Sequence, residues 1–223
     1  MRVSQTRAEK LGEMLAWTKS GVLAAMGLVA SGILGAKLSE AQATGVYEID
    51  AKASRVEIHV YRTGALSGLG DDHQIQLTRF SGAASREEGE PWQVHVVGEA
   101  ASFVVLDPNL SDSARREVQE TMLGASQLDV SRYPRIEIKS RSVAPGEAAG
   151  SLLLQADLTL HGVTRAVEFP FAWTQSERRM SVHGKKQLYL RDFGIQPIRK
   201  FFGTLQVRNG FEVVYDLQLA RRD

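Results

Sequence analysis

Residues 152–173 read LLLQADLTLHGVTRAVEFPFAW, and the fold class rests on the pattern they show. Apolar side chains occupy alternate positions in two successive runs: Leu152, Leu154, Ala156, Leu158 and Leu160, then Val163, Val167, Phe169, Phe171 and Trp173. Successive side chains of a β-strand point to opposite faces, so a period of two predicts two long strands, each with one buried side. Pro170 has no backbone N–H, and it predicts a bulge or a sheet edge within the second strand.

The same alternation predicts strands elsewhere in the chain. Residues 55–62 alternate apolar and polar side chains, and residues 211–219 carry an apolar side chain at every odd position. Weaker strand candidates are residues 73–80, 92–106, 135–143, 180–190 and 203–207. Pro145-Gly146 and Asn209-Gly210 are turn signals, and the second predicts a type I′ hairpin turn.

One stretch predicts a helix. Ser111 to Leu123 (SDSARREVQETML) opens on capping residues, contains no glycine, proline or aromatic residue, and stops before Gly124. We expect this helix to form a lid. Eight or more antiparallel strands with a single helix favour a closed barrel or a sandwich, because closure removes the exposed edges of a sheet.

Composition and charge exclude several classes of protein. The 223 residues carry 27 Lys plus Arg and 26 Asp plus Glu, so the net charge of +1 provides no broad field for phosphate, and we predict no nucleic-acid partner. The chain has no cysteine, which excludes disulfides, thiolate nucleophiles and cysteine-ligated metals.

The N-terminus has the features of an export signal. Basic residues precede the uncharged stretch 20–36, and Ala41-Gln42-Ala43 offers the small residues that signal peptidase accepts. We predict a signal peptide at residues 1–43, a single domain at residues 44–223, and a periplasmic or secreted protein. If the signal is not cleaved, it anchors the protein in the membrane.

The inward faces of the predicted strands are apolar. An eight-stranded barrel either fills its interior with its own side chains or encloses one small ligand, so these faces decide between a dry core and a hydrophobic guest. Both alternatives stay open at this point. The predicted lining is Ile58, Val60, Leu154, Leu158, Val167, Phe169, Phe171, Trp173, Phe211, Val213 and Tyr215.

Three segments resemble the signatures of a known family. They are Met122 to Ser140 (MLGASQLDVSRYPRIEIKS), Ala156 to Phe169 (ADLTLHGVTRAVEF) and Leu188 to Ile195 (LYLRDFGI), and their order and spacing are similar to those of the YceI-like, polyisoprenoid-binding, lipocalin-like proteins. Val46 to Val60 (VYEIDAKASRVEIHV) resembles the first hairpin of that family.

The resemblance implies an all-β fold, an extended eight-stranded antiparallel barrel with one short helix, exported to the periplasm. It also implies an apolar channel that accommodates isoprenoid chains, such as those of quinones or polyprenyl phosphates. Fitted to this fold, Tyr133-Pro134 turns the chain from the lid into a strand, His161-Gly162 makes a tight hairpin, and Asp192-Phe193-Gly194 ends a strand. We expect no other cofactor.

Polar residues are candidates for the mouth of such a barrel. Asp71, Asp72 and His73 stand where a subgroup of the family has Leu-Gly-His-Asp-His, and because Asp71 replaces the first histidine we predict no two-histidine metal site and assign no metal ligand. Together the three residues could still ligate a divalent cation. The three residues could bind a polar head group or form an ordinary polar turn. Arg191 could orient a head group or pair with Asp192.

Catalytic motifs are not found in the sequence. It has neither a Gly-x-Ser-x-Gly elbow nor a His-Glu-x-x-His helix, and His59 and His95 lie on the outward faces of their strands. His183 next to Gly184-Lys185-Lys186 predicts a charged hairpin tip, or a contact with anionic lipid at a membrane surface.

Three hypotheses follow. The favoured one is a periplasmic protein that binds or carries an amphiphilic isoprenoid lipid without catalysing a reaction. The second is an enzyme that acts on such a lipid, with Asp72 and His73 as an acid and base pair at the mouth. The third is a structural or interaction protein with a filled core. A homodimer that shields a protruding lipid tail fits the first hypothesis.

Overall fold

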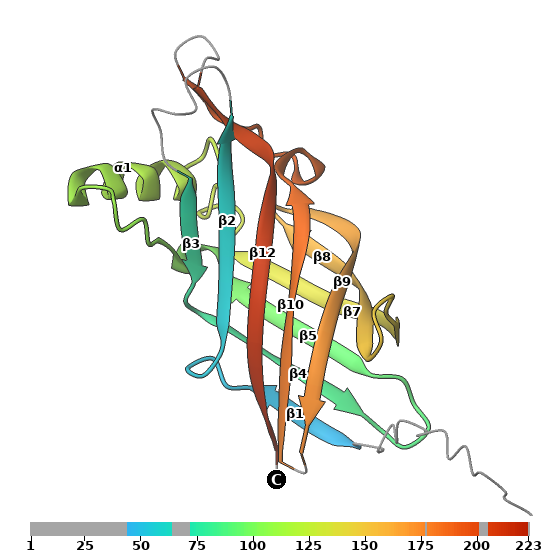
Figure 1. The fold of residues 1–223 in the computed structure, drawn as a ribbon. Helices are drawn as coiled ribbons and strands as arrows, with labels where there is room; N and C mark the ends of the chain where they lie inside the picture. Colours follow the sequence, from blue (N-terminus) through green and yellow to red (C-terminus); the bar gives the residue numbers. More distant parts are fainter. Residues whose placement is uncertain (1–43, 64–71, 177, 201–204, 223) are drawn as a thin grey trace, which may run out of the picture. The chain divides into compact units, whose positions relative to one another are not determined.

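The computed structural model describes residues 44–63, 72–176, 178–200 and 205–222. Eight antiparallel strands close into a barrel, and β12 returns to β1 to complete the ring (Figure 1). In their order around the ring they are β1 (Gly45–Ile49), β4 (Phe80–Arg86), β5 (Gln93–Glu99), β7 (Arg135–Pro145), β8 (Ser151–Leu160), β9 (Val163–Gln175), β10 (Arg179–Tyr189) and β12 (Leu205–Arg221). The predicted eight-stranded antiparallel barrel is confirmed, whereas the predicted signal at residues 1–43 lies outside the described residues.

The barrel wall extends beyond this ring through three further strands. β12 pairs with β1 near its end, but its residues 206–216 pair with β2 (Arg55–Thr63), which in turn pairs with β3 (His73–Leu77) and β6 (Phe103–Val105) in succession. Only two residues separate β3 from β4, and the short 3-10 helix η2 (Ala100–Ser102) separates β5 from β6. Two of the strands predicted from sequence, 73–80 and 92–106, are therefore broken where the wall bends. A further short strand, β11 (Arg199–Lys200), pairs with the start of β12.

Helix α1 (Asp112–Leu123) protects the outer edge of β6. The Ser111 hydroxyl caps its first turn by accepting from Ala114 N–H, and Gly124 follows its last residue, as the sequence predicts. Gln119 accepts a hydrogen bond from the Val105 N–H at 2.8 Å and donates one to the Phe103 carbonyl at 2.6 Å. One side-chain amide therefore provides hydrogen-bond partners for two backbone groups on the edge of β6 that would otherwise be open to pairing with another strand. Among the described residues, no helix has the length and hydropathy needed to cross a membrane.

The residues that carry the family resemblance meet at one end of the β8–β9 hairpin. His161 and Gly162 form its two-residue turn with φ of 50° and 71°, and the Tyr133 ring packs against His161 with a centroid distance of 4.4 Å. A Cβ on Gly162 would lie 2.5 Å from the Tyr133 ring. His161 also contacts the Phe193 carbonyl oxygen at 3.1 Å. These motifs thus have a structural role in joining β7, β8 and the turn after β10.

Pro170 marks the point where β9 leaves β10. β9 pairs with β8 from Val163 to Ala172, but it pairs with β10 only from Phe171 to Gln175. A proline has no backbone N–H to donate to a neighbouring strand. The β9–β10 ladder therefore ends next to Pro170, the position at which the sequence predicts a bulge or a sheet edge.

Two turn predictions were wrong. Asn209-Gly210 lies inside β12, at a shift of register between Val207 and Phe211, and neither residue has the positive φ that a type I′ turn requires. Residues 183–186 lie inside β10 and pair with β12, while the chain turns between Gln175 and Arg179. In both places pairing with neighbouring strands outweighs the local turn signal.

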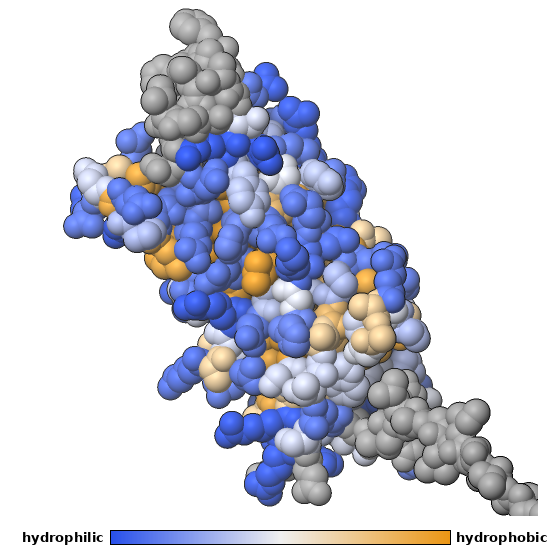
Figure 2. All heavy atoms as spheres, viewed as in Figure 1, coloured by the Kyte–Doolittle hydropathy of each residue, from blue (hydrophilic) through white to orange (hydrophobic). Residues whose placement is uncertain are grey.

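The core lies inside the barrel. The outer surface on the face shown in Figure 2 is mainly hydrophilic, with small apolar areas between polar side chains. Buried apolar residues form three clusters along the interior, centred on Phe169 and Phe211, on Ile75 and Phe103, and on Tyr47 and Leu219. This arrangement follows from the alternation, which places every second side chain of each strand inside.

Candidate functional site

Two adjoining cavities lie within the barrel. We call the first the barrel cavity; it has a volume of about 220 Å³ and is bounded by strands on all sides. The second, the helix-side cavity, has a volume of about 340 Å³ and is bounded partly by Val118 and Met122 of α1. Four residues line both of them: Ile58, Phe103, Leu160 and Phe211. The two spaces therefore follow each other along the interior, and the described side chains do not fill it.

Among the residues that the structure describes, none with a charged side chain lines the barrel cavity. Its wall is built from aliphatic and aromatic residues on alternate positions of the strands, including Phe169, Phe171 and Trp173 from β9. Polar side-chain atoms come only from tryptophan and from Tyr215. Such a lining can hold hydrocarbon by burial.

The Tyr215 hydroxyl is satisfied by the protein itself. It donates a hydrogen bond to the Pro170 carbonyl at 2.5 Å, and the ring packs edge-on against Phe169 with a centroid distance of 6.3 Å. Burial raises the pKa of the Tyr215 phenol. The hydroxyl is therefore neutral at physiological pH and committed to the wall, so the barrel cavity keeps its apolar character.

Most of the lining residues predicted from sequence face these cavities. Ile58 and Phe211 line both, and Val60 lines the helix-side cavity. Those that line the barrel cavity are Leu154, Leu158, Phe169, Phe171, Trp173, Val213 and Tyr215. Val167 faces neither cavity; it is 8% exposed and packs in the core opposite Ala156 of β8. Alternation predicts which face of a strand a residue occupies, but not whether that face meets another side chain or an open space.

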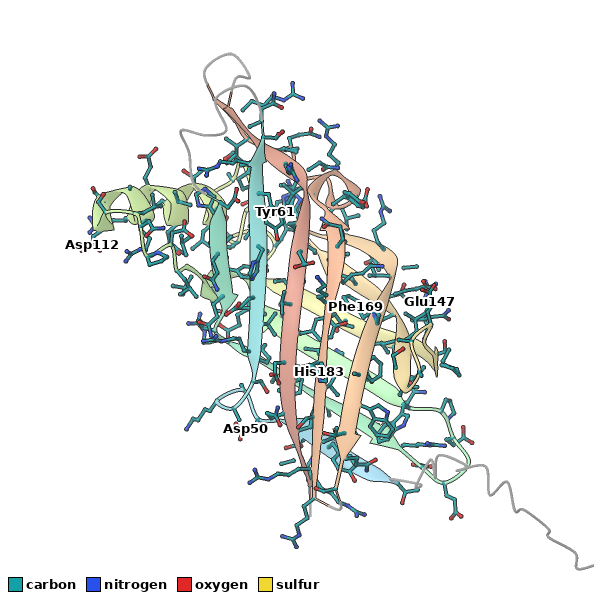
Figure 3. The ribbon with its side chains drawn as sticks, viewed as in Figure 1. Asp50, Tyr61, Asp112, Glu147, Phe169 and His183 are labelled. Carbon is teal, nitrogen blue, oxygen red and sulfur yellow. The ribbon has the colours of Figure 1, made fainter. Side chains whose placement is uncertain are left out.

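Polarity in the helix-side cavity increases away from the barrel cavity. Along β2 the lining runs from the shared Ile58 through Val60 to Tyr61 and Arg62, and along β12 it runs from the shared Phe211 to Val207 and then Gln206. β3 repeats the order: Leu77 lines the barrel cavity, Ile75 the helix-side cavity, and His73 its outer end. Figure 3 shows Tyr61 near the upper end of the barrel and Phe169 farther down. The interior is thus amphiphilic along its length.

His73 is held by a buried carboxylate at the outer end. Asp107 is 4% exposed, and its Oδ2 accepts a hydrogen bond from His73 Nδ1 at 2.6 Å. Its Oδ1 accepts from the Gln74 N–H at 2.8 Å, and its backbone carbonyl accepts from Arg115 Nε at 3.2 Å. Both carboxylate oxygens are occupied, so the imidazole is fixed in orientation by Asp107. Sequence reasoning missed Asp107, because it lies 34 residues away and precedes a proline, where an aspartate is typical of an ordinary turn.

The other polar residues predicted for the mouth lie elsewhere. Asp72 Oδ1 accepts a hydrogen bond from the Arg62 N–H at 3.0 Å and lies 3.7 Å from Arg62 Nε, so His73 pairs with Asp107 and Asp72 does not contact it. Asp71 lies outside the described residues. Arg191 is exposed in the 3-10 helix η3 (Leu190–Phe193) and lines neither cavity. Within the described ranges, no three His, Asp or Glu residues are placed to hold a metal ion.

Comparison with known proteins identifies relatives over most of the barrel. A family model described as the YceI-like domain matches residues 47–219. UPF0312 proteins from strains of Vibrio cholerae are 35% identical over 105 residues, which are 44% of this chain and 55% of theirs. The match therefore spans about half the length of these curated relatives.

Solved structures share the fold at low sequence identity. BcnA from Burkholderia cenocepacia has a TM-score of 0.60 at 15% identity, covering 76% of this chain and 98% of that protein. A polyisoprenoid binding domain from Saccharophagus degradans, implicated in plant cell wall breakdown, has a TM-score of 0.55 at 15% identity, covering 79% and 98%. A YceI protein from Campylobacter jejuni has a TM-score of 0.50 at 8% identity, covering 67% and 85%.

Proposed function

The chain belongs to the YceI-like family, and on that premise we propose that it binds or carries an amphiphilic isoprenoid lipid of the quinone or polyprenyl type. In this proposal the isoprenoid chain occupies the barrel cavity, and the polar head lies at the outer end of the helix-side cavity. The site of action is the periplasm, reached through the export signal predicted at residues 1–43. A contact with the membrane surface and a homodimer stay predictions from the sequence.

One observation carries this proposal: an uncharged cavity continues into one whose outer end is polar. Burying a methylene group contributes about 0.8 kcal/mol, so two or three isoprene units support roughly micromolar binding after the costs of association. The order of polarity along β2, β3 and β12 matches a molecule with an apolar tail and a polar head. The binding domain from Saccharophagus degradans, with a similar fold, bears the name polyisoprenoid binding, which supports the same ligand class.

The proposed role is binding, and catalysis is not part of it. Apart from the Tyr215 hydroxyl, the described lining of the barrel cavity contains no group that could transfer a proton or attack a lipid. That hydroxyl already donates a hydrogen bond to the Pro170 carbonyl. The acid and base pair predicted from Asp72 and His73 does not form, because Asp72 contacts Arg62. His73 with Asp107 is a polar pair of the site, and His73 lines the outer end of the helix-side cavity rather than the barrel cavity.

Native mass spectrometry of protein purified without detergent tests this function. The expected spectrum contains a second species, heavier by the mass of one lipid, and organic extraction of the same sample yields an isoprenoid compound. A barrel that is empty after gentle extraction of cell material, and that binds no isoprenoid added in solution, would contradict the proposal.

A further inference from the structure

His73 has a fixed orientation in the helix-side cavity. Its Nδ1 is committed to Asp107 at 2.6 Å, and the carboxylate that holds it is itself held by the Gln74 N–H. The ring lines the cavity and is 23% exposed, and since Nδ1 is committed to Asp107, the second nitrogen, Nε2, is the ring nitrogen left to meet a ligand. No described residue forms a hydrogen bond with Nε2. A fixed polar atom beside apolar side chains is suited to orient one end of a ligand.

Each basic side chain in the described lining at this end has a carboxylate nearby. Arg62 lies 3.7 Å from Asp72, and His73 lies 2.6 Å from Asp107. The remaining charged side chain of the described lining, Glu117, is an acid. A phosphate or diphosphate would have to compete with two carboxylates for these donors and would lie near a third. An uncharged head meets no such competition.

We propose that His73, positioned by Asp107, hydrogen-bonds the head group of the lipid and selects an uncharged head with an oxygen atom, a hydroxyl or a carbonyl, over a phosphate. The inference rests on the proposed function, and it chooses between the quinone-type and polyprenyl phosphate ligands that the fold leaves open. Asp107 is a positioning residue here: it occupies Nδ1 and thereby directs Nε2 to the ligand. A single hydrogen bond of this kind corresponds to about tenfold in affinity.

Four probes with the same fifteen-carbon tail test the inference: farnesol, farnesal, farnesyl monophosphate and the hydrocarbon farnesene. Their dissociation constants can be measured by quenching of tryptophan fluorescence, since Trp92 and Trp173 line the barrel cavity. We expect farnesol to bind about tenfold more tightly than farnesene, because its hydroxyl can donate to an unprotonated Nε2 or accept from a protonated one. Farnesal should gain affinity only where Nε2 carries a proton, and farnesyl monophosphate should bind more weakly than farnesol. Farnesol against farnesal distinguishes a hydroxyl head from a carbonyl head.

Three variants locate the effect at His73. His73→Phe should bring the affinity for farnesol down to that for farnesene and leave farnesene unchanged. His73→Asn keeps a donor for Asp107 near the Nδ1 position but removes Nε2, so it should have the same effect without leaving a buried carboxylate unpaired. His183→Phe makes the matched change on the outer face of β10 and should alter none of the four affinities.

Asp107→Asn tests positioning separately from packing. An asparagine can still accept from the Gln74 N–H, but its amide would donate to His73 Nδ1 and move the ring proton to Nε2. Nitrogen-15 NMR of histidine should show that Nδ1 carries a proton in the native protein and does not in the variant. The ratio of farnesol to farnesal affinity should change with it, which a merely structural role of Asp107 would not produce.

The outcomes separate this inference from the proposed function. Tighter binding of farnesyl monophosphate than of farnesol overturns the selection of an uncharged head. An unchanged ratio of farnesol to farnesene affinity in both His73 variants overturns the assignment of His73, while the carrier function stands because farnesene still binds. If none of the four probes binds the native protein, the carrier function fails and the inference fails with it.

Discussion

The hydroxyl of Tyr215 in β12 reaches the Pro170 carbonyl of β9 at 2.5 Å, across the intervening strand β10. The residue between them is Gly184, which is the register partner of Tyr215 on one side and of Phe171 on the other. The side chain of Tyr215 lies over the glycine, so a large residue on one strand covers the gap that a small residue leaves on the next. This contact bridges the wall at the point where the β9–β10 ladder ends.

Gly184→Ala should destabilise the barrel. The added Cβ would clash first with the backbone carbonyl of Pro170 and would lie 2.6 Å from the Tyr215 hydroxyl oxygen, so both the β9 backbone and the phenol must move. We expect a loss of about 1–3 kcal/mol in the free energy of unfolding, measured by chemical denaturation. In the Tyr215→Phe background the same substitution should cost less. Equal costs in the two backgrounds would show that the hydroxyl does not occupy the space over the glycine.

The raised pKa of Tyr215 predicts that the free energy of unfolding decreases at alkaline pH. Burial raises its pKa in the folded state above the ordinary value of 10.0, so its contribution is fully present below about pH 10. Above that pH the unfolded chain releases the proton and the folded chain retains it, and stability falls by about 1.4 kcal/mol per pH unit from this group. Tyr215→Phe should show a shallower fall between pH 10 and roughly pH 12. The exposed Tyr189→Phe is the control, and its slope should equal that of the native protein.

The strands of the barrel that are predictable from sequence are those with a strong local pattern. β8 and β9 alternate clearly over their length, and Ser111 and Gly124 mark the ends of α1. β4 was not predicted, because its sequence FSGAASR has mostly small side chains that do not show an apolar face. The turn predicted at Asn209-Gly210 was wrong because a turn signal reflects only the local sequence. In the folded chain β12 pairs with β10 on one side and with β2 on the other, and this pairing keeps it extended.

The candidate site is predictable only in its apolar part. Alternation places Leu154 and Phe169 inside, because facing inward is a property of a strand and its period. The pairing of His73 with Asp107 depends on β3 and the segment after β6 lying side by side, which is a property of the closed fold. No spacing in the sequence relates these two residues, so the histidine could be suspected but its partner could not.

Filling the barrel cavity should abolish binding without unfolding the protein. Leu154→Trp adds a ring to a cavity of about 220 Å³ that is not filled by side chains, so we expect at least a tenfold loss in affinity for farnesol and a change of less than about 1.5 kcal/mol in stability. Gln155→Trp places the same ring on the outer face of the same strand and is the matched control. If Leu154→Trp binds as well as the native protein, the tail does not occupy the barrel cavity.

Gln119 should determine how firmly α1 closes the helix-side cavity. Its amide is the partner of both the Val105 N–H and the Phe103 carbonyl, and α1 supplies Ala114, Val118 and Met122 to the cavity wall. Gln119→Ala leaves two backbone groups at the edge of β6 without these partners, at a cost of about 1–3 kcal/mol each if they stay dry, so water should enter beside the helix. We expect faster hydrogen exchange at Val105 and a higher dissociation rate for farnesol, with the rest of the barrel unchanged.

The neighbouring Glu120→Ala removes a side chain from the exposed face of the same helix and should change neither rate. The comparison separates an effect on docking from an effect on helix propensity, because alanine is the better helix former in both variants. Faster exchange at Val105 with an unchanged dissociation rate would mean that α1 caps the strand edge but does not retain the ligand. A change in neither quantity would mean that water replaces the Gln119 amide at no cost, and that the apolar contacts of Val118 and Met122 alone hold the helix in place.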